Sequence, residues 1–471
     1  MSSYKLIVHD VPVLVVGGGP VGMLTATQLA HHGVQCMLAE RNLELTKWPK
    51  MDITNCRSME LLRRLKLADE LRKIALFEAW LKPVIEANPL INCYFGLKFK
   101  SLSETSDGVV SLLRDTTTEQ YHIVKSKYLV GCDGSGSRVR KASKINLTGG
   151  PVPSALYLVH FKSRDLAKLR KQGQFWHIYF THGGFIISQD EVNTFTAHLL
   201  ISLDEDVDRF DPKEIVYKVL GGHAGLFHID IDKIMVNNAW RLNLVVADNY
   251  RSKRGCVFPA GDSVHQNIPT GGYGMNTGVA DAYDIGWKLA AVLNGYAGEY
   301  LLQSYNTERR PVTLRNVERS DLHFSVVTTY IGMASEKGTD VLLSATEEAK
   351  FPDSPVVVND GSEEKEWNPS HYTPSTWPGV RAPHVFLKDG TTSIFDLYGE
   401  NYTVIDFTAD GIISQEFQEA ASSIRVPLKR VHLPSEPHVR SVWERGVVLV
   451  RPDGFLAGVT VTFRRTIQVV K

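Results

Sequence analysis

The sequence has few cysteines and no long hydrophobic run. It holds five cysteines with no CxxC pair and no zinc-like spacing, so we expect reduced thiols, mostly in the core, and no metal site. They are Cys36, Cys56, Cys93, Cys132 and Cys256. No apolar stretch approaches the roughly 20 residues that cross a bilayer, and residues 1–10 contain no signal-peptide core. A cytoplasmic protein without membrane association is predicted.

An excess of charge is lacking as well. Lys plus Arg and Asp plus Glu number 52 each, so no net field attracts a polyanion. Basic residues and aromatics do not alternate in a stripe, and nucleic acid is not an expected partner. Hydrophobic residues make up 43% and charged residues 22% of the 471 residues, which is typical of a globular chain of two or three domains that can bury a large cofactor.

The first forty residues predict a βαβ unit that binds a dinucleotide. An apolar, β-branched run at 11–16 leads into GGGPVG at 17–22, a helical pattern follows, and a short second strand ends at Glu40. Gly17 permits the sharp turn, Gly19 lets a pyrophosphate approach the backbone, and Gly22 allows close packing, while the helix start supplies amides. Glu40 accepts hydrogen bonds from a ribose. The predicted cofactor contacts are Gly17, Gly19, Pro20, Val21, Gly22, Glu40 and Arg41.

A second glycine-bearing turn lies far along the chain, at residues 255–282. An apolar strand delivers Gly261 and Asp262, and a helix begins near residue 275. The carboxylate suits ribityl hydroxyls, and bare amides at a helix start suit the negative edge of a reduced flavin. A turn-rich loop capping a buried helix would explain the glycines but not the preceding Gly-Asp. The predicted contacts are Asp262, Pro269, Gly271, Gly272, Gly274, Met275 and Asn276.

These motifs resemble those of the FAD-dependent aromatic hydroxylases of the para-hydroxybenzoate hydroxylase and phenol hydroxylase type. Three fingerprints are present: GGGPVG at 17–22, CDGSGSRVR at 132–140 and AGDSVHQNIPTGGYGMNTGVADA at 260–282. The resemblance spans nearly the whole chain, and the extra C-terminal region is typical of phenol hydroxylases. It implies that Asp133, Gly134 and Arg138 contact both FAD and the nicotinamide cofactor.

The loop at 49–60 resembles the phenol hydroxylase segment beside the flavin ring. The resemblance implies that Asp52 is the catalytic base that removes the phenol proton; a helix cap or a solvent-facing acid is the alternative. Lys50 stands where the family often has Arg at a flavin contact. Arg57 either binds the cofactor or pairs with Glu60.

The chemistry that the resemblance implies is hydroxylation of a phenolic or polyketide-derived aromatic substrate by molecular oxygen, in secondary metabolism. FAD is reduced by NADPH or NADH, which binds transiently without its own Rossmann domain, and a flavin C4a-hydroperoxide transfers oxygen. Alternatives on the same scaffold are an epoxidase, a Baeyer-Villiger or decarboxylating monooxygenase, and an inactive flavin-binding remnant. We expect His265 to be structural.

The predicted fold is α/β, with a Rossmann-type FAD-binding domain, a β-rich substrate domain and a small thioredoxin-like domain. The FAD-binding domain comprises residues 1–150 and 255–335, and the substrate domain residues 151–254. A linker at 336–383 precedes the thioredoxin-like domain at 384–471. No cysteine follows Cys256, so that domain performs no thiol chemistry, and packing or homodimerisation is its expected role.

One segment departs from the family. Relatives carry some tens of residues between the helix predicted at 58–71 and the next helix at 76–87, including strands of the substrate domain and an Arg or Gln beside the flavin. Only residues 72–76 intervene here. A gene-model or splicing loss and a natural shortening both explain this, and both leave the substrate pocket partly open.

Overall fold

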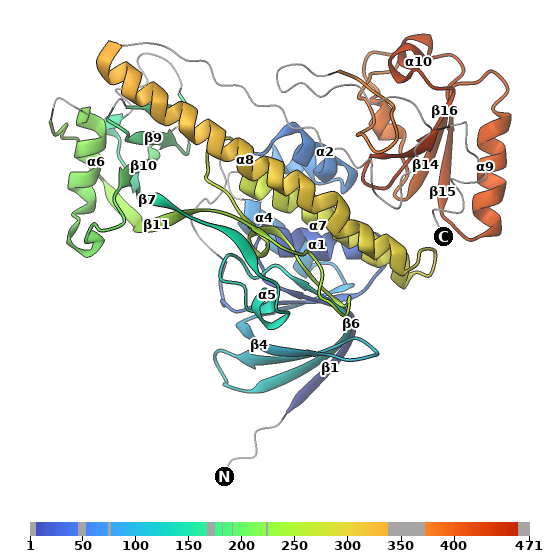
Figure 1. The fold of residues 1–471 in the computed structure, drawn as a ribbon, viewed down its shortest axis with the longest axis horizontal. Helices are drawn as coiled ribbons and strands as arrows, with labels where there is room; N and C mark the ends of the chain where they lie inside the picture. The colour runs from blue at the N-terminus through green and yellow to red at the C-terminus, as the bar shows by residue number, and fades with distance from the viewer. Residues whose placement is uncertain are drawn as a thin grey trace.

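A computed structural model describes most of the chain, in three sheets joined by long helices (Figure 1). The described residues are 6–45, 53–73, 77–166, 175–180, 182–190, 192–222, 225–337 and 373–459. Among them, no helix is both long enough and apolar enough to cross a membrane.

The first sheet has the order β3-β2-β1-β6-β5-β4, and β12 pairs with β6. The pairs among β1, β2, β3, β6 and β12 are parallel, whereas β4 and β5 form an antiparallel extension. Because β1 is rich in β-branched residues and its second half is buried on both faces, it lies at the centre of this Rossmann-type sheet. The strands are β1 (Ile7–Val16), β2 (Cys36–Glu40), β3 (Ile91–Phe95), β4 (Leu97–Glu104), β5 (Val109–Asp115), β6 (Tyr121–Gly131) and β12 (Val257–Pro259).

Helices α1 (Pro20–His31), α4 (Phe77–Glu86) and α7 (Tyr273–Leu293) cover this sheet with α5 (Arg138–Ala142). The single helix predicted at 58–71 is wrong, because the structure has α2 (Cys56–Arg64) and α3 (Ala68–Leu71). Lys66 has a left-handed φ of 61°, and the amide of Leu67 bonds back to the carbonyl of Leu62, which ends α2.

Helix α8 (Glu299–Lys337) runs along α7 and spans the molecule from the second sheet to the C-terminal domain (Figure 1). Helix α7 is buried along most of its length, and Trp287 on it is fully buried. These two helices therefore connect all three parts of the fold.

The second sheet has the order β13-β11-β7-β10-β9-β8. Helix α6 (Pro212–Gly221) packs on one face, together with alternate residues of β7 and β10 such as Phe161 and Phe195. The other face carries Leu156 and Leu242, which pack with Ile268 of the FAD-binding part. The strands are β7 (Leu147–Lys162), β8 (His177–Tyr179), β9 (Phe185–Ser188), β10 (Thr194–Ile201), β11 (Lys233–Ala247) and β13 (His265–Gln266).

The C-terminal part has a thioredoxin-like order of elements. Its sheet is β15-β14-β16-β17, with β15 parallel to β14 and the other pairs antiparallel. Trp377, Val380 and Ala382 pack in its core, so this domain begins before the boundary predicted at residue 384. The elements are β14 (Tyr402–Asp406), α9 (Ile412–Ser423), β15 (Leu428–His432), α10 (Pro437–Trp443), β16 (Val447–Val450) and β17 (Leu456–Val459).

All five cysteines are free thiols, but they are not mostly in the core. Only Cys36 is buried, and Cys56 at the start of α2 is exposed. Burial raises the pKa of the Cys36 thiol to about 12, so this thiol stays protonated at neutral pH.

Candidate functional site

The first glycine turn admits no side chain at two of its positions. Gly17 has a φ of 113°, and a Cβ there would lie 2.2 Å from the carbonyl oxygen of Cys132. A Cβ at Gly22 would lie 1.9 Å from the carbonyl oxygen of Gly17. A Cβ at Gly19 would meet nothing within 4 Å, so the backbone is open to a ligand there. This is the cradle that a pyrophosphate requires.

The start of α1 and the end of β2 complete this half of the site. No side chain caps α1, whose N-cap is Gly19 and whose first residue is Pro20, so first-turn amides remain for an anion. Glu40 is buried and accepts hydrogen bonds from the amides of Gly18 (2.7 Å) and Asn42 (2.9 Å). These bonds fix the carboxylate at the carboxyl end of β2, where a ribose would lie. Arg41 is exposed.

The second glycine turn forms the start of α7. Gly271 and Gly272 have φ values of 83° and 67°, which favour glycine. Gly272 is the N-cap and no side chain caps the helix, while a Cβ at Gly274 would meet nothing within 4 Å. Bare amides and the positive end of a helix dipole therefore face an open space, as a flavin edge requires. Pro269 is exposed and Met275 is half-buried.

The two turns meet through Val21 on α1. A Cβ at Gly261 would lie 2.9 Å from Cγ2 of Val21, and a Cβ at Gly278 of α7 would lie 2.7 Å from the same atom. Residues more than 200 positions apart thus form one surface, because two glycines leave room for one valine. Asp262 follows Gly261 directly and is exposed. The glycine-lined surfaces therefore fit a single extended dinucleotide.

The Asp-Gly fingerprint joins the same surface through Cys132, whose carbonyl oxygen faces Gly17, and through Gly131, which precedes it. The carbonyl oxygen of Gly131 accepts a hydrogen bond from Oγ of Ser263 at 2.7 Å. Asp133 accepts bonds from Oγ of Ser137 and from the amide of Arg138, so its carboxylate caps α5. Gly134 has a φ of 79° with open space around it, and the Arg138 side chain is exposed. Asp133 thus has a local structural role, and Arg138 is the member of this motif that projects outward.

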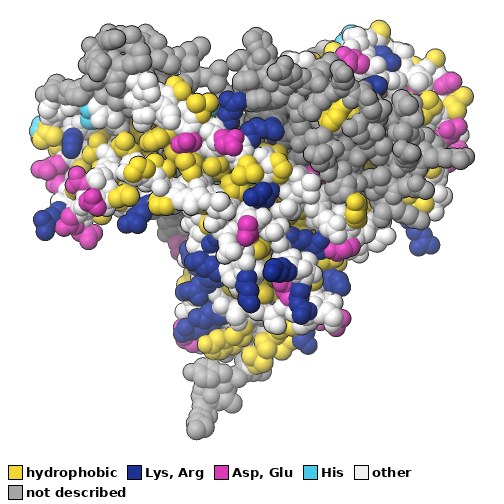
Figure 2. Space-filling view, in the orientation of Figure 1, with side chains coloured by type: hydrophobic (Ala, Val, Ile, Leu, Met, Phe, Trp, Pro, Cys, Tyr) yellow, Lys and Arg dark blue, Asp and Glu magenta, His cyan; other side chains and the backbone are white. Residues whose placement is uncertain are grey.

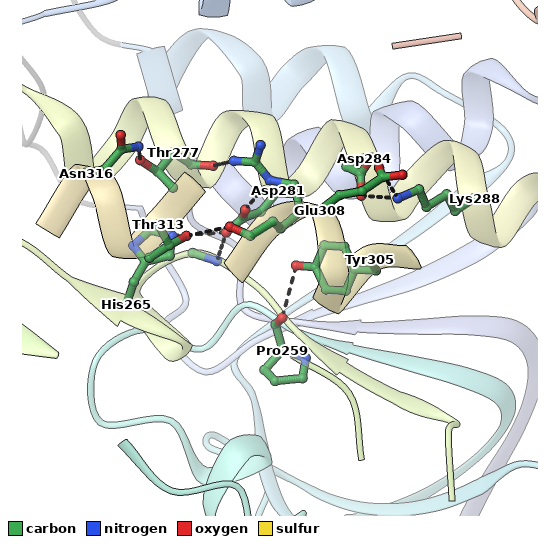
Figure 3. A network of polar contacts seen from close by, with 12 residues as sticks. Pro259, His265, Thr277, Asp281, Asp284, Lys288, Tyr305, Glu308, Thr313 and Asn316 are labelled. Atoms are coloured by element: carbon green, nitrogen blue, oxygen red, sulfur yellow. Dashed lines mark hydrogen bonds and ion pairs between the residues drawn. The ribbon is translucent and has the colours of Figure 1, made fainter. Parts of the chain in front are cut away.

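A buried acid that the sequence reasoning missed holds the Gly-Asp turn in place (Figure 3). Asp281 accepts hydrogen bonds from the amide of Gly261 (3.1 Å), Nε2 of His265 (3.0 Å) and Nε of Arg309 (2.8 Å). Burial alone would raise the pKa of Asp281, but Arg309 and His265 outweigh it and hold that pKa below its usual value. The sequence did contain a signal for this role, because Asp281 is an acid on the apolar face of a predicted helix.

Asn276 uses its whole side chain inside the protein. Its Nδ2 donates to the carbonyl oxygens of Ile53 (3.1 Å) and Gly272 (2.7 Å), and its Oδ1 accepts from the amide of Asn55 (3.0 Å) and Oγ of Ser58 (2.7 Å). The predicted cofactor contact could come only from its backbone. The side chain instead fastens the start of α2 to the start of α7.

Arg57 lies against the C-terminal domain. Its guanidinium donates to the carbonyl oxygen of Asp453 at 2.6 Å, pairs with Glu60 at 3.4 Å, and lies over the ring of Phe455. The guanidinium that was predicted to bind the cofactor is therefore engaged within the protein. Its ion pair with Glu60 agrees with the second of the two predicted roles of Arg57. Lys50 and Asp52 lie outside the described residues.

A second buried network joins the C-terminal domain to α7 and α8. Arg451 is fully buried and bonds to both oxygens of Glu308 (2.7 and 2.6 Å) and to Asp453 (2.6 Å). Lys288 bonds to Glu308 (2.8 Å) and Asp284 (2.7 Å). The three carboxylates are near enough to share a cation, but the two basic side chains already occupy their oxygens. We call these five residues the interdomain network.

Comparison with known proteins identifies the family. A sequence profile described as FAD binding domain matches residues 10–87 and 76–320, and one described as aromatic-ring hydroxylase, C-terminal, matches residues 375–465. The FAD-dependent monooxygenase apdD of Emericella nidulans is 38% identical over 94% of this chain and 86% of its own length. The chain belongs to the FAD-dependent aromatic-ring hydroxylases. This family consists of flavoprotein monooxygenases.

Two further similarities cover nearly the whole length of the hydroxylase. The 4-methyl-5-nitrocatechol 5-monooxygenase of a Burkholderia species is 27% identical over 95% of this chain and 94% of its own. The solved complex of aklavinone-11 hydroxylase with FAD and aklavinone superposes with a TM-score of 0.86 at 25% identity, covering 98% of this chain and 99% of that one. The predicted fold class is confirmed.

The comparisons also bear on the shortened segment. The alignment with apdD extends over 545 positions, more than the 471 residues of this chain, so the relative has residues at many positions where this hydroxylase has none. The FAD-domain match is divided where its two parts meet, at residues 76–87. Helix α3 ends at Leu71 and α4 begins at Phe77, and the parallel strands β1, β2, β3, β6 and β12 of the Rossmann-type sheet are all present.

Proposed function

We propose that this hydroxylase uses NADPH or NADH and molecular oxygen to insert one oxygen atom into a phenolic or polyketide-derived aromatic compound, with the second oxygen atom released as water. One observation carries the proposal: Val21, in the first glycine turn, packs against Gly261 and Gly278 of the second. A single FAD can therefore contact both turns. Relatives whose names or structures include aromatic polyketide substrates, such as aklavinone, support the substrate class.

The residues divide the work of holding FAD by their chemistry. The amides at the start of α1 suit the pyrophosphate, Glu40 the ribose, Asp262 the ribityl hydroxyls, and the amides after Gly272 the flavin edge. Bound FAD supplies electron transfer from the nicotinamide to oxygen and oxygen insertion into the substrate. The protein's own residues orient the two molecules and exclude water. Contacts from Gly134, Arg138 and Met275 are part of the proposal.

The roles of Asp52 as base and Lys50 as a flavin contact stay predictions, as do a cytoplasmic location and a homodimer. Secondary metabolism is the setting that we propose, because apdD and the aklavinone hydroxylases are related to this chain. An epoxidase or a Baeyer-Villiger enzyme would share the same cofactor site and differ only in product.

Purified protein tests the proposal directly. We expect stoichiometric FAD, NADPH consumption that rises when 2-naphthol is added, and a product heavier by one oxygen atom by mass spectrometry. Protein without flavin would contradict the cofactor site. Bound flavin with NADPH consumption that yields only hydrogen peroxide would favour the flavin-binding remnant, which the shortened segment makes the specific rival.

A further inference from the structure

Four ring side chains follow one another on the second sheet, on the face away from α6. His177 stacks on Tyr179 (5.9 Å between ring centroids), Tyr179 contacts Phe185 (5.3 Å), and Phe185 stacks on His198 (4.4 Å, 8° between planes). They come from three neighbouring strands, β8, β9 and β10. We call these four residues the aromatic strip.

The aromatic strip continues the apolar surface that begins beside the second glycine turn. Leu156 of β7 packs with Ile268, which directly precedes the turn, and Phe185 belongs to the same apolar cluster. Leu200 lies opposite Leu156, and His198 is two residues from Leu200 on the same face. With ordinary strand spacing, His198 is roughly 8 Å from Leu156. A molecule lying on this face can reach from the cofactor site to His198.

The strip is only partly covered by the protein. Tyr179 is 43% exposed, and Trp176, which contacts the ring of His177, is 46% exposed. Figure 2 shows hydrophobic side chains gathered in a band over the region of the second sheet and α8. Contiguous exposed apolar patches on soluble proteins mark ligand-binding grooves or interaction sites.

His198 offers a polar atom that the protein does not use. Its side chain is 7% exposed, and its Nδ1 is buried with no hydrogen-bond partner among the described residues. His160 on the same face differs, because its Nδ1 bonds to Oγ1 of Thr196 at 2.9 Å. An unpaired buried nitrogen is costly, and a ligand that bonds to it removes that cost.

The two imidazoles of the strip are neutral. Burial lowers the pKa of His177 to about 4, and burial together with His177 lowers the pKa of His198 to about 3. A neutral imidazole has one donor and one acceptor nitrogen and offers no positive charge to a carboxylate. The strip therefore suits an uncharged polar group on a flat ring.

We propose that the aromatic strip binds the end of the substrate remote from the flavin, as an uncharged aryl ring that lies against Phe185 and exchanges a hydrogen bond between its hydroxyl or carbonyl oxygen and His198. The inference rests on the proposed function and deepens it, since it assigns a specificity-determining residue. It selects neutral phenols over aryl carboxylates.

Three naphthalenes test the strip, with binding followed by the change that each causes in the absorbance of bound FAD. They are 2-naphthol, 2,6-dihydroxynaphthalene and 6-hydroxy-2-naphthoate, which share one phenol and differ at the opposite end. We expect the diol to bind about tenfold more tightly than 2-naphthol, in line with one hydrogen bond, and the naphthoate to bind most weakly. Equal affinities for all three, or no absorbance change with the diol, would overturn the proposal.

Variants separate the hydrogen bond from ring packing. His198→Phe keeps a ring and removes the polar atoms, so the diol should bind no better than 2-naphthol, whose affinity should stay unchanged. His198→Gln, which retains a donor and an acceptor, should restore part of the preference. A preference that persists in His198→Phe would contradict the role of His198.

The control is His122→Phe, which replaces another mostly buried histidine, on β6 and paired with His9 in the FAD-binding domain. FAD content and NADPH-driven flavin reduction should be the same in all variants. If the wild-type protein bound no FAD or showed no flavin reduction by NADPH, that result would instead count against the proposed function.

Discussion

On the FAD-binding side, backbone and side chains pack so closely around Gly17 and Gly22 that not even a methyl group fits. Beside and on the second sheet of the same chain, Trp176 and Tyr179 keep almost half of their surface exposed. The glycine turns and the exposed rings thus lie in separate sheets of the fold.

The largest effect is expected from a substitution at Gly22, and its absence would contradict the tight packing described for the first glycine turn. A valine there would place Cβ against the carbonyl oxygen of Gly17, so Gly22→Val should lose FAD completely, or fail to fold, as measured by flavin absorbance and circular dichroism. Gly150→Val is the matched control, because a Cβ at Gly150 meets nothing within 4 Å and this glycine lies outside the three fingerprints. A yellow, stoichiometric Gly22→Val protein would show that the first turn is not the cofactor cradle.

The next effect concerns the interdomain network. Arg451→Leu leaves Glu308 and Asp453 buried without their main partner, and breaking a buried ion pair typically costs about 3–5 kcal/mol. The free energy of unfolding, measured with urea, should fall by that amount. Arg72→Ala, which removes an exposed pair with Asp69, should change it by less than about 1 kcal/mol. Similar losses in the two variants would mean that the network adds little.

A smaller effect is expected from Asp281→Asn. This variant tests whether the buried acid contributes to FAD binding or only to stability. The amide cannot accept from Gly261, His265 and Arg309 as a carboxylate does, so FAD should bind roughly 10- to 100-fold more weakly, equivalent to one charge-assisted hydrogen bond. Fluorescence titration of apoprotein with FAD measures this. Unchanged FAD affinity would assign Asp281 to stability alone.

A pH dependence of stability is also expected at Asp284. Burial raises its pKa from 3.8 to about 7, so the folded protein holds this proton more tightly than the unfolded chain, and stability declines as pH rises from about 4 through 7. Asp284→Asn cannot ionise, so its melting temperature relative to the wild type should rise between pH 5 and pH 8. The pKa of Glu308 is lowered to about 2, so Glu308 stays ionised throughout this pH range. A constant difference between the two proteins would contradict the raised pKa.

The glycine turns were predictable because glycine at those spacings has few purposes other than a turn or a close approach. The thioredoxin-like domain followed from the order of its strands and helices. The roles of Asn276 and Arg57 were not predictable, because each depends on residues brought near only by the tertiary fold. Asp281 escaped notice for the same reason, since its partners Gly261 and Arg309 lie in other elements of the fold. Local sequence motifs therefore predicted the position of the site, but not the side chains that hold its loops and helices in place.

Helix α7 has two ends with different duties. Its first turn presents amides that no side chain caps, and Asp284, farther along the same helix, pairs with Arg451 of the C-terminal domain at 3.7 Å. A ligand that binds only the folded protein stabilises everything that folds with it. A shortage of FAD would therefore also leave the C-terminal domain easier to unfold.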